Sequence, residues 1–285
     1  ATFGTNQLIS AGGRDGFVAK YNATGQLLWV RRFGGPGYDL VNGVTSDPGG
    51  NCYLVGTFEG NATFGAATIT NTSPSAYSDV AILKLDAGGT LVWAATLGVA
   101  SMNDGGNAIA LDAAGNVLVA GQSVLDTFAG SALDNQGRIF VAKFDNAGHP
   151  LWARKGGSYS GGTFDVAQGV GADATGNIYL TGVFLSPVAA FGAVNLTNRG
   201  GSDAFLLKYD ASGNAQWVRH FGGPKDDRAN GVGLDSAGNA YVAGEFLETL
   251  QMPGTNLVAG STNLNLFLAR FGPAGTLDWA RQAGG

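Results

Sequence analysis

Two histidines and one cysteine are the side chains that most readily suggest catalysis in this 285-residue sequence. His149 and His220 stand in unrelated surroundings, and neither has a second ligand at a metal-motif spacing such as HExxH. Cys52 has no partner for a disulfide and lies in an apolar segment, which is typical of a buried, inert thiol. A nucleophile motif of the G-x-S-x-G type is also missing. We therefore predict no catalytic residue, no metal ligand and no cofactor, and we expect a protein that is not an enzyme.

Aspartates in a recurring Asp-x-x-Gly-Asn segment are a second candidate, because carboxylates bind calcium. They are Asp47, Asp112, Asp173 and Asp235. Each segment offers one carboxylate, whereas a tight calcium site needs about six to eight oxygen ligands. An aspartate can also accept a hydrogen bond from the backbone N–H two residues later, and glycine supplies the positive φ of a short hairpin loop. We interpret these segments as hairpin turns.

The most irregular segments are GGPGYD, GVASMND, GGSYSGGTFD and GGPKDD, and they hold our candidate ligand-binding residues. Binding residues concentrate on variable loops that a rigid scaffold holds in place. The candidates are Tyr38, Asp39, Asn103, Asp104, Tyr159, Asp165, Asp226 and Asp227. The alternative interpretation is that these side chains only cap the ends of strands.

The elements that position these residues follow from an internal repeat. Every tryptophan lies in one register, at positions 29, 93, 152, 217 and 279, and a lysine or arginine stands nine residues before each. A second unit, with the Asp-x-x-Gly-Asn turn, alternates with the tryptophan unit. Each unit contains two apolar runs split by turn residues, which predicts a hairpin. We name the strands of the Asp-x-x-Gly-Asn unit a and b, and those of the tryptophan unit c and d.

About 62 residues per four-stranded unit is typical of a β-propeller blade. We predict an all-β fold, a propeller of about five four-stranded blades with one incomplete, and almost no helix. A β-solenoid is the alternative, although its coils are shorter and more uniform. The predicted single domain spans 1–285, with a half-blade at 1–35 and full blades at about 36–98, 99–157, 158–223 and 224–285. A short FGxxxx[IL] element precedes each tryptophan unit, and the pattern assigns no structure to it.

The segment DAFLLKYDASGNAQWVRHFGGPKDDRANGVGLDSAGNAYVAGEF resembles the SBBP β-propeller repeat of exported and surface proteins of bacteria. The resemblance extends over essentially the whole chain in five registered copies. It implies a propeller, a secreted or cell-surface location in bacteria, and a repeat that usually has no assigned enzymatic activity.

Charge and hydropathy exclude two classes of partner. The chain has 16 Lys and Arg against 21 Asp and Glu, for a net charge of −5, the wrong sign for binding nucleic acid or an anionic membrane. Its apolar runs are far shorter than the roughly 20 residues that span a bilayer, and the amino end has no signal-peptide pattern. We expect no nucleic-acid partner and no membrane insertion.

An arginine two residues after tryptophan recurs at Arg31, Arg154, Arg219 and Arg281, and Ala95 replaces it in the second copy. A residue repeated in every blade most simply has the same structural task in each. Stacking of the arginine on the tryptophan, or pairing with an aspartate, would suffice. We interpret the tryptophans as packing between blades, and a sugar-stacking role stays open for any that are exposed.

The strand count suggests a function. The sequence has five c and d pairs but four a and b pairs, and a sheet edge without a partner is a template for another chain. Three explanations are open: residues upstream of Ala1 supplied the missing pair, another protomer donates it, or the ring stays open. We expect a non-enzymatic extracellular or cell-surface module for adhesion or protein assembly, polymerising by strand donation at the incomplete blade. Its partners would be other protein chains, itself included, or surface glycans. A carbohydrate-binding propeller is the first alternative, and an enzyme with a site in a central channel is the second.

Overall fold

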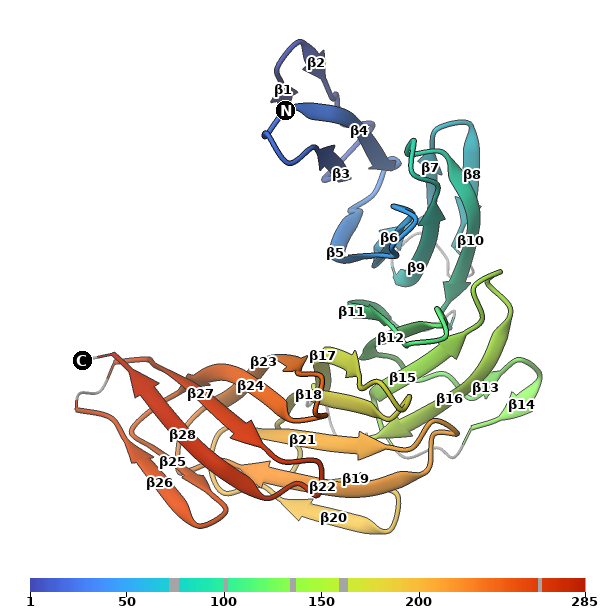
Figure 1. The fold of residues 1–285 in the computed structure, drawn as a ribbon. Coiled ribbons are helices and arrows are strands. Elements are labelled where there is room, and N and C mark those ends of the chain that lie inside the picture. Colours follow the sequence, from blue (N-terminus) through green and yellow to red (C-terminus); the bar gives the residue numbers. More distant parts are fainter. Residues whose placement is uncertain (72–76, 100–101, 134–136, 159–163, 261–262, 285) are drawn as a thin grey trace. The chain divides into compact units, whose positions relative to one another are not determined.

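The computed structural model describes residues 1–71, 77–99, 102–133, 137–158, 164–260 and 263–284. Every regular element in these ranges is a β-strand, as Figure 1 shows, so the all-β prediction is confirmed. The chain forms two compact units. One unit holds Ala1–Ile109, Ser123–Leu125 and Ala147–His149, and the other holds Ala110–Gln122, Asp126–Asn146 and Pro150–Gly285.

Four repeats each form an antiparallel sheet in the order a, b, c, d. The first two of these sheets contain β5 (Leu40–Ser46), β6 (Cys52–Glu59), β9 (Ser78–Leu85) and β10 (Leu91–Leu97), then β11 (Gly105–Leu111), β12 (Val117–Gln122), β15 (Ile139–Phe144) and β16 (Pro150–Gly156). The last two contain β17 (Val166–Ala172), β18 (Ile178–Phe184), β21 (Asp203–Tyr209) and β22 (Ala215–Phe221), then β23 (Asp227–Leu234), β24 (Ala240–Phe246), β27 (Asn265–Phe271) and β28 (Leu277–Ala283).

The Asp-x-x-Gly-Asn segments form the predicted a-to-b turns. In the third complete sheet, Asp173 Oδ1 accepts hydrogen bonds from the backbone N–H of Thr175 (2.9 Å) and Asn177 (3.0 Å). The Asn177 side chain donates to Asp173 Oδ2 over 2.8 Å. Gly176 has a φ of 84°, which explains the glycine at this turn. The motif is therefore a hydrogen-bonded turn that joins strands a and b.

The FGxxxx[IL] element, to which the sequence assigned no structure, is a short hairpin that precedes strand c and, in the four complete repeats, lies between strands b and c. The hairpins are β1 (Thr2–Phe3) with β2 (Asn6–Gln7), β7 (Asn61–Phe64) with β8 (Ala67–Thr70), β13 (Thr127–Phe128) with β14 (Ser131–Ala132), β19 (Val188–Phe191) with β20 (Val194–Thr197), and β25 (Thr249–Met252) with β26 (Thr255–Val258). Three of them pair with the end of the preceding d strand, through Phe33↔Phe64, Gly157↔Ala190 and Gly222↔Gln251. The element therefore links consecutive repeats.

The first repeat is built differently. Its c and d strands, β3 (Gly16–Tyr21) and β4 (Leu27–Gly34), form a sheet with the hairpin β7–β8 in the order β3-β4-β7-β8. Strand β3 is thus an edge strand, whereas the other four c strands are paired on both sides. Among the described residues, no a or b strand completes this sheet.

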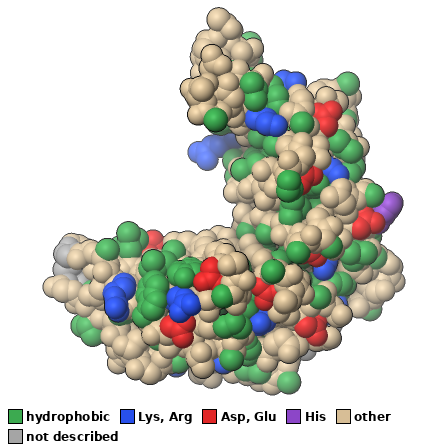
Figure 2. Space-filling view, in the orientation of Figure 1, with side chains coloured by type: hydrophobic (Ala, Val, Ile, Leu, Met, Phe, Trp, Pro, Cys, Tyr) green, Lys and Arg blue, Asp and Glu red, His purple; other side chains and the backbone are tan. Residues whose placement is uncertain are grey.

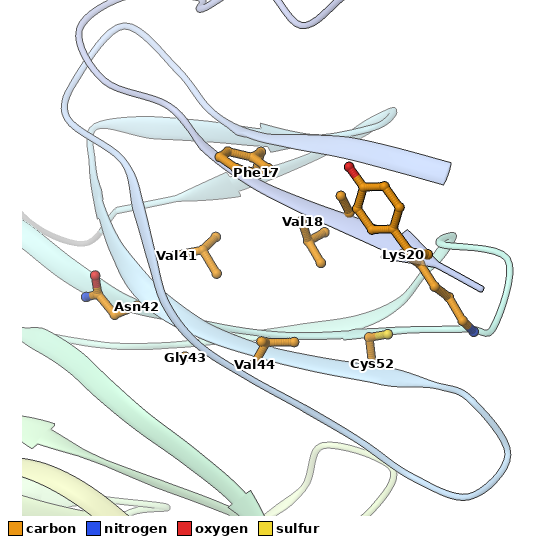
Figure 3. Close-up of a pocket in the computed structure, with 10 residues that line it drawn as sticks. Phe17, Val18, Lys20, Val41, Asn42, Gly43, Val44 and Cys52 are labelled. Carbon is orange, nitrogen blue, oxygen red and sulfur yellow. The ribbon is translucent and has the colours of Figure 1, made fainter. Parts of the chain in front are cut away.

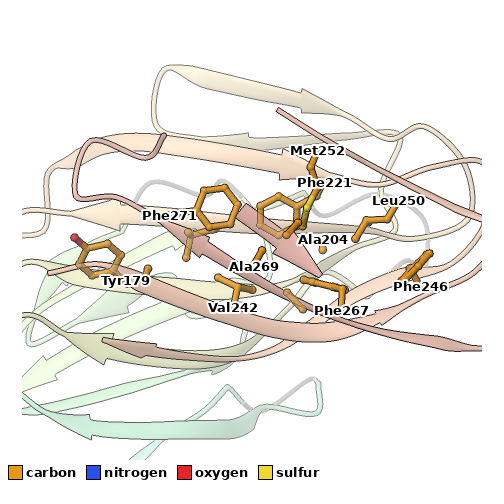
Figure 4. Packing of buried hydrophobic residues seen from close by; sticks show 14 residues of the cluster. Tyr179, Ala204, Phe221, Val242, Phe246, Leu250, Met252, Phe267, Ala269 and Phe271 are labelled. Atoms are coloured by element: carbon orange, nitrogen blue, oxygen red, sulfur yellow. The ribbon is translucent and has the colours of Figure 1, made fainter. Parts of the chain in front are cut away.

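One hydrophobic core cluster of the second unit lies between its last two sheets, as Figure 4 shows. Leu206 and Ala204 of β21 have no exposed surface and pack in one cluster with Ala229, Val232 and Leu234 of β23. Phe221 and Phe271 stack with ring centroids 5.5 Å apart. Strand a of one repeat therefore covers the c strand of the repeat before it. Blade number, ring closure and the single domain stay predictions.

Candidate functional site

The four aspartates that we singled out in the d-to-a loops are almost completely buried. Asp39, Asp165 and Asp227 are 0% exposed and Asp104 is 1% exposed. The Asp165 carboxylate accepts hydrogen bonds from the backbone N–H of Ser158 (2.7 Å), Leu185 (2.8 Å) and Ser186 (3.1 Å). It thus joins its own loop to the loop that follows strand b. This position matches the strand-capping alternative.

Burial changes the acidity of three of these groups. Desolvation raises the pKa of Asp227 to about 7, and the nearby Asp203 carboxylate adds to the effect. Desolvation also raises the pKa of Asp104 to about 6, with a smaller contribution from Asp79, and it raises the pKa of Asp39. Hydrogen bonds from backbone N–H groups oppose the shift in each case. These aspartates are buried titratable groups within the fold.

The other candidates are exposed, except for Tyr159, which lies outside the described residues. Tyr38 is 58% exposed. Asn103 accepts a hydrogen bond of 3.0 Å from Ser78 N, and Asp226 accepts one of 3.0 Å from Ser202 Oγ. A ligand-binding role for these residues stays a prediction.

The tryptophan and arginine of strand d form a clamp on the c-to-d turn of the next repeat. Arg31 donates from Nε to Gly89 O (3.1 Å) and from Nη2 to Gly88 O (3.2 Å), and Trp29 Nε1 donates to Ala87 O (3.0 Å). The corresponding arginine bonds join Arg154 to Gly213 and Ser212, and Arg219 to Gly275 and Ala274. We call this pair of side chains the Trp-Arg clamp. Of the two arrangements expected for the arginine, stacking on the tryptophan is the one found, with distances of 5.0 to 5.7 Å from Cζ to the ring centroid in these three clamps.

Two structural features require glycine in each clamped turn. Gly89, Gly148, Gly213 and Gly275 have φ values of 77° to 89°. A Cβ at Gly89 would also lie 2.8 Å from a ring carbon of Trp29, and a Cβ at Gly275 would lie 2.8 Å from a ring carbon of Trp217. The tryptophan ring therefore lies directly on the turn, which requires a residue without a side chain.

The last tryptophan–arginine pair and the first c-to-d turn share the local geometry of the others. Arg281 donates to the carbonyl of the adjacent Ala280 (2.9 Å) and lies over the Trp279 ring at 6.0 Å. Gly25, the glycine of the first turn, has the usual φ of 78°.

A hollow of about 450 Å³ runs along the free edge of β3, as Figure 3 shows. Strand β3 lines it with residues 17–21, and β5 lines it with residues 41–44, next to Cys52. Burial raises the pKa of the Cys52 thiol, which keeps it protonated. In the second unit, strand b occupies the corresponding place, because β18 pairs with β21 and packs against β23. The hollow therefore corresponds to the place of a missing strand b.

Lys20 faces this hollow and makes a hydrogen bond that a tyrosine makes in the second unit. Its Nζ donates to Ala87 O (3.2 Å) and Gly50 O (3.0 Å). In the second unit, Lys208 donates to the matching carbonyl, Pro273 O, over 3.1 Å. There, however, the hydroxyl of Tyr179 donates to Gly238 O, the counterpart of Gly50 O, over 3.1 Å. Lys208 lies over the Tyr179 ring at 5.0 Å and 3.9 Å from the Asp173 carboxylate.

The last sheet presents an apolar surface. Leu266 and Leu268 of β27 are 59% and 41% exposed, whereas the matching Ala204 and Leu206 of β21 are covered by β23. A hollow of about 480 Å³ lies here, lined by residues 266–268 and 281–283 among others. Figure 2 shows that charged side chains are scattered thinly over the visible face, as the composition predicts.

Two other kinds of feature are absent from the described residues. No group of three or more His, Cys, Asp or Glu side chains there is placed to hold a metal ion. None of the described segments forms a helix that could cross a membrane.

Residues 216–245 match the family model described as SBBP, beta-propeller repeat. The chain is 22% identical to the uncharacterized WD repeat-containing protein L264 of Acanthamoeba polyphaga mimivirus, over 86% of this chain and 22% of that protein. It is 28% identical to the regulatory protein FlaEY of Caulobacter vibrioides, over 51% of this chain and 15% of that protein. The matches thus span less than a quarter of either relative.

A crystal structure of a protein of unknown function from Bacteroides caccae aligns with a TM-score of 0.40 and 10% identity, over 91% of this chain and 87% of that one.

Proposed function

Because this chain carries a β-propeller repeat of the SBBP family, we propose that it is a non-enzymatic module for protein assembly or adhesion in an extracellular or cell-surface setting. The observation that carries the proposal is the free edge of β3 beside a hollow of about 450 Å³. An unpaired strand edge accepts a strand from another chain through main-chain hydrogen bonds. Partner binding occurs by addition of a strand b at this edge.

The complete sheets indicate the register and chemistry of the donated strand. In three of them a tyrosine stands opposite the c-strand cation, as Tyr53↔Lys84, Tyr179↔Lys208 and Tyr241↔Arg270. An aspartate lies six residues before each tyrosine. A donated strand in this register places its tyrosine opposite Lys20, with the hydroxyl on Gly50 O. The Lys20 ammonium then pairs with the aspartate of the donated turn. It also lies over the ring of the donated tyrosine, which forms a cation–π contact.

A synthetic hairpin tests this function. The peptide of residues 227–247 contains β23, the Asp-x-x-Gly-Asn turn and β24 with Tyr241. We expect saturable binding of the fluorescein-labelled peptide to the chain in fluorescence anisotropy. Lys20→Met should weaken binding at least about tenfold, because the ion pair and the cation–π contact are both lost. A Tyr241→Phe peptide, which loses the bond to Gly50 O, should bind several-fold less tightly.

Lys225→Met is the matched control, because Lys225 is an exposed lysine in a different repeat. It should bind the peptide as the unchanged chain does. Circular dichroism verifies that each variant is folded. Absence of saturable binding to the folded chain, or equal affinity for Lys20→Met, contradicts strand donation at β3.

A further inference from the structure

The contact between the last two sheets of the second unit buries two carboxylates. Asp203 is the first residue of β21 and Asp227 is the first residue of β23, and neither has exposed surface. A Cβ at Gly222 would collide with the Asp203 carboxylate. The next residue, Gly223, donates from its backbone N–H to Asp227 Oδ2 over 2.6 Å. The two acids thus contact consecutive residues after β22, and two negative charges buried there are unfavourable. We call this contact the β21–β23 junction.

One base and one further acid surround this pair. His220 Nε2 of β22 lies 2.6 Å from Asp203 Oδ2, and the imidazole packs against Phe184 with ring centroids 5.3 Å apart. Asp226 lies directly before Asp227 in the d-to-a loop and also disfavours its charged form. No cation among the described residues bonds to the Asp227 carboxylate. The other charged side chains of the surrounding elements are half-buried or exposed, namely Arg199, Lys225, Arg228, Glu245 and Glu248.

The preceding contact of the same unit has cations at the matching positions. There β17 packs against β15, and Asp165 is the buried aspartate of the d-to-a loop. Arg138 has the position of Asp203, directly before the paired residues of strand c. Lys155 has the position of His220 in strand d. Both cations are buried, with exposures of 3% and 4%. The β15–β17 junction and the β21–β23 junction therefore share one fold and differ in charge.

We propose that the β21–β23 junction is a pH-sensitive contact, in which loss of a proton from Asp227 to water releases β23 from β21 while the β15–β17 junction stays closed. A protonated acid is tolerated in a buried site, whereas an ionised Asp227 beside Asp203 requires water, which local opening admits. Strand β23 can leave because it pairs with β24 alone at the edge of its sheet. Its release exposes Ala204 and Leu206. The folded-state pKa of about 7 places this change near neutral pH.

Hydrogen exchange measured by mass spectrometry on the complete chain tests the proposal. Protection is the ratio of the intrinsic to the observed exchange rate, and it is compared at about pH 5.5 and about pH 8.5. We expect the protection of β23 to fall at least about tenfold over this range, since the limit for an aspartate whose pKa changes from about 7 to about 3.9 on opening is about thirtyfold. Protection of β17 should change less than about threefold, because buried cations favour a charged aspartate. Equal falls in β17 and β23 overturn the proposal.

Two variants of the junction and one matched control assign the effect. Asp227→Asn should give β23 the same protection at both pH values, because an amide stays neutral. Asp203→Asn removes the opposing charge and should reduce the fall in protection. Asp165→Asn changes the corresponding aspartate of the β15–β17 junction and should leave the pH dependence of β23 as in the unchanged chain. Circular dichroism verifies that each variant is folded. A pH dependence of β23 that persists in both junction variants overturns the assignment.

His220→Gln separates the carboxylate from the imidazole, since histidine is the side chain that ordinarily titrates near neutral pH. Glutamine can still donate a hydrogen bond to Asp203 but does not titrate in this range. We expect β23 to keep most of its pH-dependent fall in protection in this variant. A fall that disappears in His220→Gln and persists in Asp227→Asn assigns the change to the histidine and overturns the proposal.

The outcomes are independent of strand donation at β3. Strand β3 and Lys20 belong to the first unit, whereas both junctions belong to the second. Binding of the hairpin peptide without a pH-dependent release of β23 contradicts this inference alone. Release of β23 without any binding of the peptide contradicts strand donation alone.

Discussion

Asp227 lies at the start of β23 with no exposed surface, and its Oδ2 accepts a hydrogen bond of 2.6 Å from Gly223 N. Its position recurs in the other d-to-a loops as Asp39, Asp104 and Asp165. The groups that face it are Asp203, which is bound to His220 over 2.6 Å, and Asp226. Burial beside other carboxylates disfavours the charged form, which is why its pKa rises to about 7.

This shift predicts how stability depends on pH. The pKa of an aspartate in the unfolded chain is about 3.9, well below the folded value of about 7. The contribution of Asp227 is therefore fully present below about pH 4 and is lost as the pH rises through 7. Asp227→Asn should be more stable than the unchanged chain at pH 8.5 and should show a smaller loss of stability between pH 5.5 and 8.5. Urea unfolding at both pH values measures this, and an unchanged pH dependence contradicts it.

Among the elements, the a-to-b turn is held by one side chain. Burial raises the pKa of Asp173, but hydrogen bonds from Asn177 and Thr175 outweigh it, and the pKa lies below its ordinary value. Four of these bonds are 3.0 Å or shorter. The carboxylate therefore favours the folded turn at neutral pH. That contribution is present above about pH 4 and is lost as the pH falls through the lowered folded pKa.

Removal of this carboxylate should destabilise the sheet. We expect Asp173→Ala to lower the free energy of unfolding by about 2 to 4 kcal/mol, because several hydrogen bonds to one buried charged group are lost together. Asp210→Ala is the control, since Asp210 makes similar bonds in an exposed c-to-d turn and should have a smaller effect. Urea unfolding of both variants at pH 7 compares them. Equal losses would show that burial of the turn does not set its contribution.

In the whole molecule, each repeat packs against its neighbour, which covers its apolar side chains and pairs with the end of its last strand. Strand β23 covers Ala204 and Leu206 of the preceding repeat, and the hairpin β25–β26 pairs with the end of β22. In repeat proteins stability is approximately a sum of repeat and neighbour terms. A chain that lacks one neighbour should therefore remain folded while exposing apolar surface.

Truncation after residue 223 tests this dependence. We expect the shortened chain to keep its β-sheet circular dichroism signal, to bind more of the dye ANS, and to unfold at lower urea concentration than the complete chain. Leu206→Ser in the truncated chain should reduce the added ANS binding, because Leu206 is part of the newly exposed surface. Unchanged ANS binding on truncation would show that β23 does not cover an apolar face.

Much of the local structure follows from the sequence because it depends on short-range rules. Turn residues and alternating apolar runs are local signals, so the hairpins and the Asp-x-x-Gly-Asn turns were predicted correctly. Arginine two residues after tryptophan lies on the same face of a strand, so its stacking on the ring was predictable as well. The hairpins at the FGxxxx[IL] elements were missed, because their strands are short and are stabilised in part by pairing with the preceding repeat.

The repeat, its strand-rich character and the residues of the turns and clamps can be identified in the amino-acid sequence, because they recur at fixed offsets from the tryptophan or the turn aspartate of each repeat. The burial of Asp39, Asp104, Asp165 and Asp227 becomes evident only in the folded chain, where each carboxylate accepts a backbone hydrogen bond from the segment about 20 residues later. The same is true of the edge position of β3, whose counterparts in the other repeats are paired on both sides. All copies share one local sequence pattern. What packs against each copy depends on the tertiary structure and cannot be predicted from that pattern.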